Sequence, residues 1–145
     1  MKWTLVLLVF HLASAFSALF LGLRTWWTPR GTPRHRRLGR FYVGTTIPLC
    51  ASAWGLHALS GRAPLTLLWL AGMCLVAAIA TPFLAMSPRR GLRAWHGHTA
   101  CLSLACLGGA IVEVLLPGPW TWPALAAVVI CLRAIPRPLP VTALV

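Results

Sequence analysis

Residues 65–86 read LTLLWLAGMCLVAAIATPFLAM, a continuous apolar stretch that contains no charged side chain. A helix needs about 20 mostly apolar residues to span the hydrocarbon core of a bilayer, and this stretch meets that length. Outward from it, the chain has further apolar segments at residues 3–23, 41–60 and 96–116, and a shorter one at residues 120–135. The pattern predicts an all-α membrane protein, with residues 1–145 forming one integral membrane domain built as a compact bundle of four to five transmembrane helices.

The composition of the chain fits a membrane protein better than a soluble one. Hydrophobic residues make up 59% of it and charged residues only 10%, whereas a soluble domain carries roughly 25% charged residues. The net charge is +12, but the basic residues lie in short segments between apolar runs, as in proteins that cross a membrane several times. We therefore expect no nucleic-acid partner. The single acidic residue, Glu113, excludes catalysis by paired carboxylates.

The distribution of arginine predicts the orientation in the membrane. Loop 24–40 carries Arg24, Arg30, Arg34, Arg36, Arg37 and Arg40, and loop 87–95 carries Arg89, Arg90 and Arg93. Loops rich in Lys and Arg stay in the cytoplasm. We therefore expect a multi-pass protein of the bacterial cytoplasmic (inner) membrane with its N-terminus outside and both loops inside. Anionic lipid headgroups are the expected partner of the Arg24–Arg40 loop.

Three ionisable side chains fall in the outer half of the predicted spans: His11, His57 and Glu113. Ionisable residues are rare at membrane depth and indicate a functional site by default. Three interpretations stay open. His11 and His57 are the axial ligands of a b-type haem; or they join Glu113 in binding a divalent metal or passing protons; or all three hydrogen-bond between helices and hold the bundle together.

The other histidines, His35, His96 and His98, lie on the cytoplasmic side. His96 and His98 are two residues apart, so they point to different faces of a helix and at most one of them faces the bundle. His35 stands among arginines, which disfavours its protonated form. It is either an exposed side chain beside lipid phosphates, or it faces His96 and forms a second pair of ligands with it.

The five cysteines, Cys50, Cys74, Cys101, Cys106 and Cys131, all lie inside apolar segments and form no CxxC pair. This predicts small apolar core residues, with a buried thiol beside a cofactor as the alternative. Small residues also line residues 100–110, ACLSLACLGGA. They let a second helix approach closely, which indicates a tight bundle, a homo-oligomer or a partner in a membrane complex.

Three segments carry a family resemblance: FHLASAFSALFLG (10–22), RGTPRHRRLGRFYV (30–43) and RGLRAWHGHTACLSL (90–104). Together they resemble the bacterial membrane protein family named domain of unknown function 2306. That family has a histidine in its first span, an HRxxGRxY signature opening the second and a histidine opening a later one. His11, His35 and His96 fall on these positions. The resemblance implies a small polytopic membrane protein with no assigned activity and directs attention to these three histidines.

These features predict a small polytopic membrane protein of unassigned activity, in an accessory or structural role. One alternative is a b-type haem or metal-binding protein in electron transfer, with ligands drawn from His11, His35, His57 and His96. Another is a small transporter or proton-conducting protein. The sequence shows no nucleophile-and-base motif and no phosphate-binding loop, so enzymatic chemistry would depend on a cofactor, haem b or a divalent metal.

Overall fold

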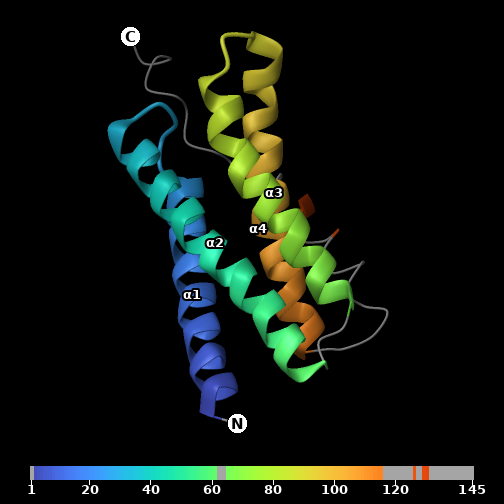
Figure 1. The fold of residues 1–145 in the computed structure, drawn as a ribbon. Coiled ribbons are helices and arrows are strands. Elements are labelled where there is room, and N and C mark those ends of the chain that lie inside the picture. The colour runs from blue at the N-terminus through green and yellow to red at the C-terminus, as the bar shows by residue number, and fades with distance from the viewer. Residues whose placement is uncertain (1, 62–64, 116–125, 127–128, 131–145) are drawn as a thin grey trace.

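The computed structural model describes residues 2–61, 65–115, 126, 129 and 130, and these residues form four α-helices and no strand. In chain order the helices are α1 (Lys2–Trp27), α2 (Pro33–Ser60), α3 (Leu65–Met86) and α4 (Arg90–Leu115) (Figure 1). The predicted all-α class is confirmed over the described part of the chain. The predicted fifth segment, 120–135, lies outside it apart from residues 126, 129 and 130.

Three helical segments are long and apolar enough to cross a membrane: Lys2–Trp27, Leu65–Met86 and Trp95–Leu115. Large apolar side chains project outward from two of them: Trp3 is 78% exposed, Phe16 71% and Trp69 71%. A soluble monomer rarely exposes so much apolar surface. These side chains are suited to contact with lipid, as the hydropathy pattern predicts.

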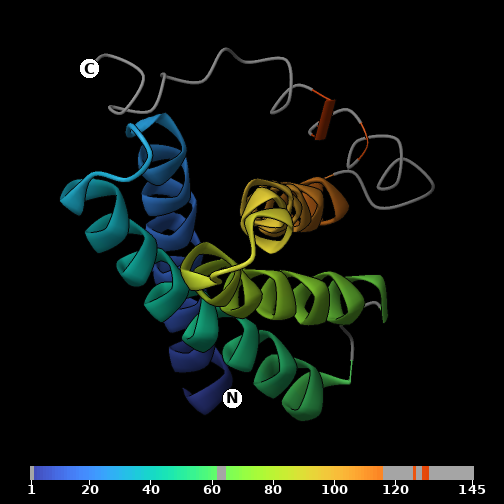
Figure 2. The same ribbon diagram turned by 90° about the horizontal axis from the view of Figure 1, so that it is seen from above.

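The helices pack as two antiparallel hairpins. α1 lies mainly against α2, and α3 mainly against α4, while α2 contacts α3 between the hairpins and α1 barely touches α4 (Figure 1). The view from above separates the two hairpins clearly (Figure 2). This alternation brings the C-terminal turns of α1 and α3 beside the N-terminal turns of α2 and α4. We call this side of the bundle the basic end, because the arginines of α1 and α2 lie there.

α2 begins earlier than hydropathy predicts, inside the arginine-rich segment. The Oγ1 of Thr32 accepts a hydrogen bond of 3.1 Å from the backbone N–H of His35, and Pro33 stands at the start of the helix. Both are favoured at helix N-termini. The loop predicted over 24–40 is therefore shorter, with only residues 28–32 between the two helices. A high arginine content is a signal for the expected side of the membrane. It does not predict the local backbone conformation.

Small side chains fill the centre of the bundle. The residues that are almost completely buried include Ala18, Cys50, Cys74, Ala78, Ala105 and Cys106. Gly22 on α1 has no room for a side chain. A Cβ there would overlap the side chain of Leu104 on α4 and touch the ring of Tyr42 on α2. Small residues let membrane helices pack at short distances. Gly22 thus allows α1 to contact both α2 and α4 at one level.

Candidate functional site

His35 lies on the first turn of α2, at the basic end, and is held from two directions. Its backbone N–H is bound by the cap residue Thr32, and its ring Nδ1 is 3.2 Å from the backbone oxygen of Thr25 near the end of α1. Since a carbonyl oxygen only accepts hydrogen bonds, Nδ1 carries the proton and donates it. The ring is half-buried. His35 therefore points into the bundle and is not an exposed side chain among lipid phosphates.

His96 occupies the matching position on α4. Its Nδ1 is 2.9 Å from the backbone oxygen of Thr81 on α3, so this Nδ1 is also the donor. The ring centroids of His35 and His96 are 6.1 Å apart, with an angle of 75° between the ring planes. His98 is exposed and lies beside Trp95, with 5.5 Å between ring centroids. The prediction that at most one of the two α4 histidines faces the bundle is confirmed.

The environment of His35 favours its neutral imidazole. Burial, and then the neighbouring ring of His96, lower the pKa of His35. With each Nδ1–H committed to a carbonyl, Nε2 is the nitrogen of each ring that is left to bind a ligand. A carbonyl that holds one ring nitrogen in this way is the usual support of a metal-ligating histidine. The Oγ1 of Thr81 also donates to the Oγ1 of Thr99 at 3.0 Å, which ties α3 to α4 beside His96.

The three ionisable residues predicted for the outer half, His11, His57 and Glu113, do not come together. The Nδ1 of His11 is 2.9 Å from the Oγ of Ser52 on α2, and Thr66 on α3 donates to the Oε1 of Glu113 at 3.0 Å. His57 lies at a separate position between α2 and α3. No group of three or more His, Cys, Asp or Glu side chains in the described part of the chain is placed to hold a metal ion. His11, His57 and Glu113 therefore do not form a set of three ligands in this structure.

Glu113 is an unusual residue for this bundle. It is 8% exposed, and its Oε2 is buried without a hydrogen-bond partner among the described residues. The Nδ1 of His57 is likewise buried and unpaired within the described residues. Most buried polar atoms in proteins have a partner, so each exception asks for an explanation. His11 and Glu113 are thus each hydrogen-bonded to a neighbouring helix, and the Glu113 carboxyl group is only half satisfied.

Between the two ends lies a cluster of buried hydroxyl and thiol groups. The Oη of Tyr42 and the Oγ of Ser103 are 2.6 Å apart, and the same Oγ donates to the backbone oxygen of Cys74 at 3.2 Å. The Cys74 thiol donates to the backbone oxygen of Ser103 at 3.4 Å, and its Sγ is 3.5 Å from the Oγ of the same residue. Tyr42 and Cys50 are eight residues apart, so helical spacing predicts a shared face of α2. The partners on α3 and α4 are not predictable in this way.

The cysteines are placed as the sequence predicts. Cys50, Cys74, Cys101 and Cys106 are buried and are not joined in disulfides. Cys131 lies outside the described residues. Their role as small core residues is confirmed for these four positions.

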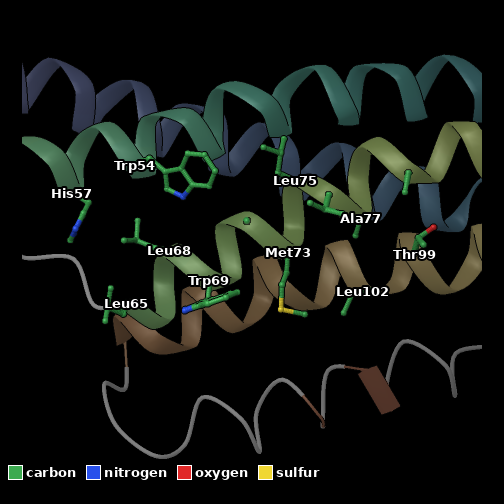
Figure 3. Close-up of a pocket in the computed structure, with 13 residues that line it drawn as sticks. Trp54, His57, Leu65, Leu68, Trp69, Met73, Leu75, Ala77, Thr99 and Leu102 are labelled. Carbon is green, nitrogen blue, oxygen red and sulfur yellow. The ribbon is translucent and has the colours of Figure 1, made fainter.

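An apolar groove with a volume of about 790 Å³ runs between α2, α3 and α4 (Figure 3). Trp54 and His57 project into it from α2, and Trp69 and Met73 line it from α3. Grooves of this size and composition suit small hydrophobic molecules. The groove does not include His35 or His96, so the paired histidines and the groove are separate features.

Comparison of the chain with family models, curated proteins and solved structures gives no match. The resemblance seen over residues 8–116 therefore stays a prediction from short motifs. Any function has to be inferred from the geometry of the site itself.

Proposed function

We propose that this chain is a multi-pass membrane protein that binds a b-type haem through His35 and His96 and serves electron transfer. The observation that carries the proposal is the facing pair of imidazoles, each with its Nδ1 bound to a backbone carbonyl. Haem iron receives four ligands from the porphyrin and needs only two from the protein. A site with two histidines, and no third ligand among the described residues, matches that requirement better than it matches a bare zinc ion, which takes four ligands.

The spacing of the rings supports the same conclusion. Two histidines that would hold one metal ion must lie close together, because metal–nitrogen bonds are only about 2.0–2.1 Å long. The ring centres of His35 and His96 are 6.1 Å apart, with an angle of 75° between the planes, so these two side chains would be able to hold the haem iron from α2 and α4.

The surroundings of the pair suit an anionic cofactor. Arg34, Arg36 and Arg37 are exposed on the same two turns of α2 that carry His35. Haem b has two propionate groups, and arginine is the side chain best suited to pair with carboxylates. Because His35 belongs to the first hairpin and His96 to the second, a bound haem would also link the two hairpins.

A spectrum of the purified protein tests this proposal. We expect reduced-minus-oxidised haem bands in detergent-solubilised wild-type protein, and loss of these bands in both His35→Ala and His96→Ala. His98→Ala is the matched control, since this side chain is on the same helix but exposed, and His11→Ala is a second control. Far-UV circular dichroism shows whether each variant keeps its helices.

Two outcomes would contradict the proposal. One is wild-type protein that shows no haem bands even after incubation with haem. The other is a His98→Ala variant that loses the bands as completely as His96→Ala. Elemental analysis of the same samples separates haem iron from a bound divalent metal.

A second candidate is the accessory or structural role, which the outer half of the bundle favours. There, His11 bonds to Ser52 across α1 and α2, and Thr66 bonds to Glu113 across α3 and α4. Hydrogen bonds of this kind hold membrane helices together without further activity. A cofactor-free wild-type protein with unchanged stability in His35→Ala would support this role.

The basic end supports a proposal on orientation and lipid contact. The side chains of Arg24, Arg30, Arg34, Arg36, Arg37 and Arg40 are all exposed there. We propose that this end faces the cytoplasm and contacts anionic headgroups, because juxtamembrane basic residues are attracted to anionic lipids. Labelling of single cysteines placed at residues 30 and 61 in intact cells tests the orientation, with only residue 61 expected to react from outside.

A further inference from the structure

The apolar groove between α2, α3 and α4 has two different ends. At one end Trp54 and His57 of α2 project toward Trp69 of α3, and at the other end the groove reaches Thr99 of α4 (Figure 3). Apolar side chains of α3 line the length between them. Its volume of about 790 Å³ falls in the usual range of ligand sites, about 300–1,000 Å³. We call the first of these the aromatic end.

The indole rings at the aromatic end are largely uncovered. Trp54 is 48% exposed and Trp69 is 71% exposed. Gly72 of α3 keeps the space beside Trp54 open, since a Cβ added at Gly72 would lie 3.8 Å from Cζ2 of Trp54 and a longer side chain would extend into the groove. Aromatic rings pack well against other flat rings. The aromatic end therefore suits a ligand with a flat ring.

His57 supplies a hydrogen-bonding group at the same end. Its Nδ1 is buried and has no hydrogen-bond partner among the described residues, and its side chain lines the groove. A neutral imidazole can donate from one nitrogen and accept at the other. The terminal torsion of histidine is broad, so the ring can turn either nitrogen toward a ligand. A ligand oxygen at the edge of a flat ring would give His57 the partner that it lacks.

We propose that the groove binds a lipid-soluble quinone. The quinone ring lies at the aromatic end beside Trp54 and Trp69, one of its carbonyl oxygens accepts a hydrogen bond from His57, and its apolar tail follows α3 toward Thr99. The acyl chain of a phospholipid fits less well, because it has neither a flat ring nor an atom that pairs with His57. The site is separate from His35 and His96, so quinone binding does not depend on haem.

The test measures binding of decylubiquinone to the full chain in phosphatidylcholine nanodiscs by isothermal titration calorimetry. Empty nanodiscs provide the blank for partitioning of the quinone into lipid. We expect saturable binding of one quinone per chain, which an equal concentration of oleate does not displace. His35→Ala protein, which lacks one of the proposed haem ligands, should bind the quinone as the wild type does.

Variants of His57 test the hydrogen bond. His57→Leu should weaken binding about three- to tenfold, the value of one ordinary hydrogen bond. His57→Gln, which keeps a donor and an acceptor, should bind more tightly than His57→Leu. His11→Leu is the matched control, because His11 belongs to another helix and does not line the groove; its affinity should equal that of the wild type.

A variant of Gly72 tests the location without touching a polar group. Gly72→Leu fills the space beside Trp54 and should weaken binding at least about tenfold, whereas the control Gly44→Leu, at a glycine with open space around it, should not. Circular dichroism shows whether each variant keeps its helices. The proposal is overturned if folded wild-type protein shows no saturable binding, if oleate displaces the quinone, or if His57→Leu or Gly72→Leu binds like the wild type.

Discussion

Replacing Thr66 with valine should reveal what the buried carboxyl group of Glu113 costs the bundle. Valine keeps the shape of threonine but removes the hydroxyl that donates to Glu113 Oε1 at 3.0 Å. Since Oε2 already has no partner among the described residues, the variant leaves both carboxyl oxygens unpaired there. Thr66→Val therefore turns a half-satisfied buried group into an unsatisfied one.

The expected loss of unfolding free energy in Thr66→Val follows from two limits. Leaving a buried polar group without a partner costs about 1–3 kcal/mol. Hydrogen bonds between membrane helices are weaker, averaging about 0.6 kcal/mol and reaching about 1.7 kcal/mol. Because Glu113 is 8% exposed and has one bond to lose, we expect Thr66→Val to lower the free energy of unfolding by about 1–2 kcal/mol, near the upper membrane value.

The companion variant Glu113→Leu should leave the free energy of unfolding unchanged or raise it. Replacing a poorly paired buried ionisable group with an apolar one is often neutral or stabilising. In the Glu113→Leu background, Thr66→Val should then cost less than about 0.5 kcal/mol, because the hydroxyl no longer has its acceptor. The free energies are measured by unfolding in mixed micelles with increasing dodecyl sulfate, followed by circular dichroism.

The double-mutant comparison can refute this account of Thr66 and Glu113. If Thr66→Val lowers the free energy of unfolding equally in both backgrounds, its hydroxyl does not act through Glu113. If Glu113→Leu is itself strongly destabilising, the carboxyl group contributes to stability and the half-satisfied description is wrong. A stabilised Glu113→Leu protein would instead indicate that Glu113 is kept at a cost in stability, as expected of a functional group.

Two further predictions concern packing and capping. Gly22→Ala should destabilise the bundle by about 1–3 kcal/mol, because its Cβ overlaps Leu104. The control Gly44→Ala should not destabilise it, since no atom lies within 4 Å of the added Cβ. Thermal melts that show equal losses of stability in the two variants would contradict this prediction. Thr32→Ala should cost about 0.5–2 kcal/mol by removing the cap of α2. It should also weaken haem binding by loosening the turn that holds His35, and unchanged haem occupancy would count against that link.

The helices are predictable from the sequence because their cause is local. An apolar run such as residues 65–86 can satisfy its backbone in a bilayer only as a helix, and the structure places α3 over the same residues. The early start of α2 also has a local signal, Thr32 followed by Pro33. Hydropathy misses this signal because it averages over a window in which the arginines dominate.

The contacts of the histidines are not predictable in the same way. Depth along each span can be estimated from the rise per residue, but the direction of a side chain around the helix axis depends on how the helices pack. Depth alone groups His11 with His57, whereas the structure pairs His11 with Ser52. The facing of His35 and His96 is one of two alternatives from the sequence, and the structure confirms it. Only the alternation between His96 and His98 follows from local geometry.

The near absence of contact between α1 and α4 bears on how the chain is made. α1 finds almost all of its packing partners on α2, so the first hairpin is complete once residue 60 has left the ribosome. Segments that fold as units during synthesis do so from the N-terminus. Translation can thus deliver two preassembled halves to the membrane in sequence, and two co-expressed polypeptides divided between residues 61 and 65 should reconstitute the bundle.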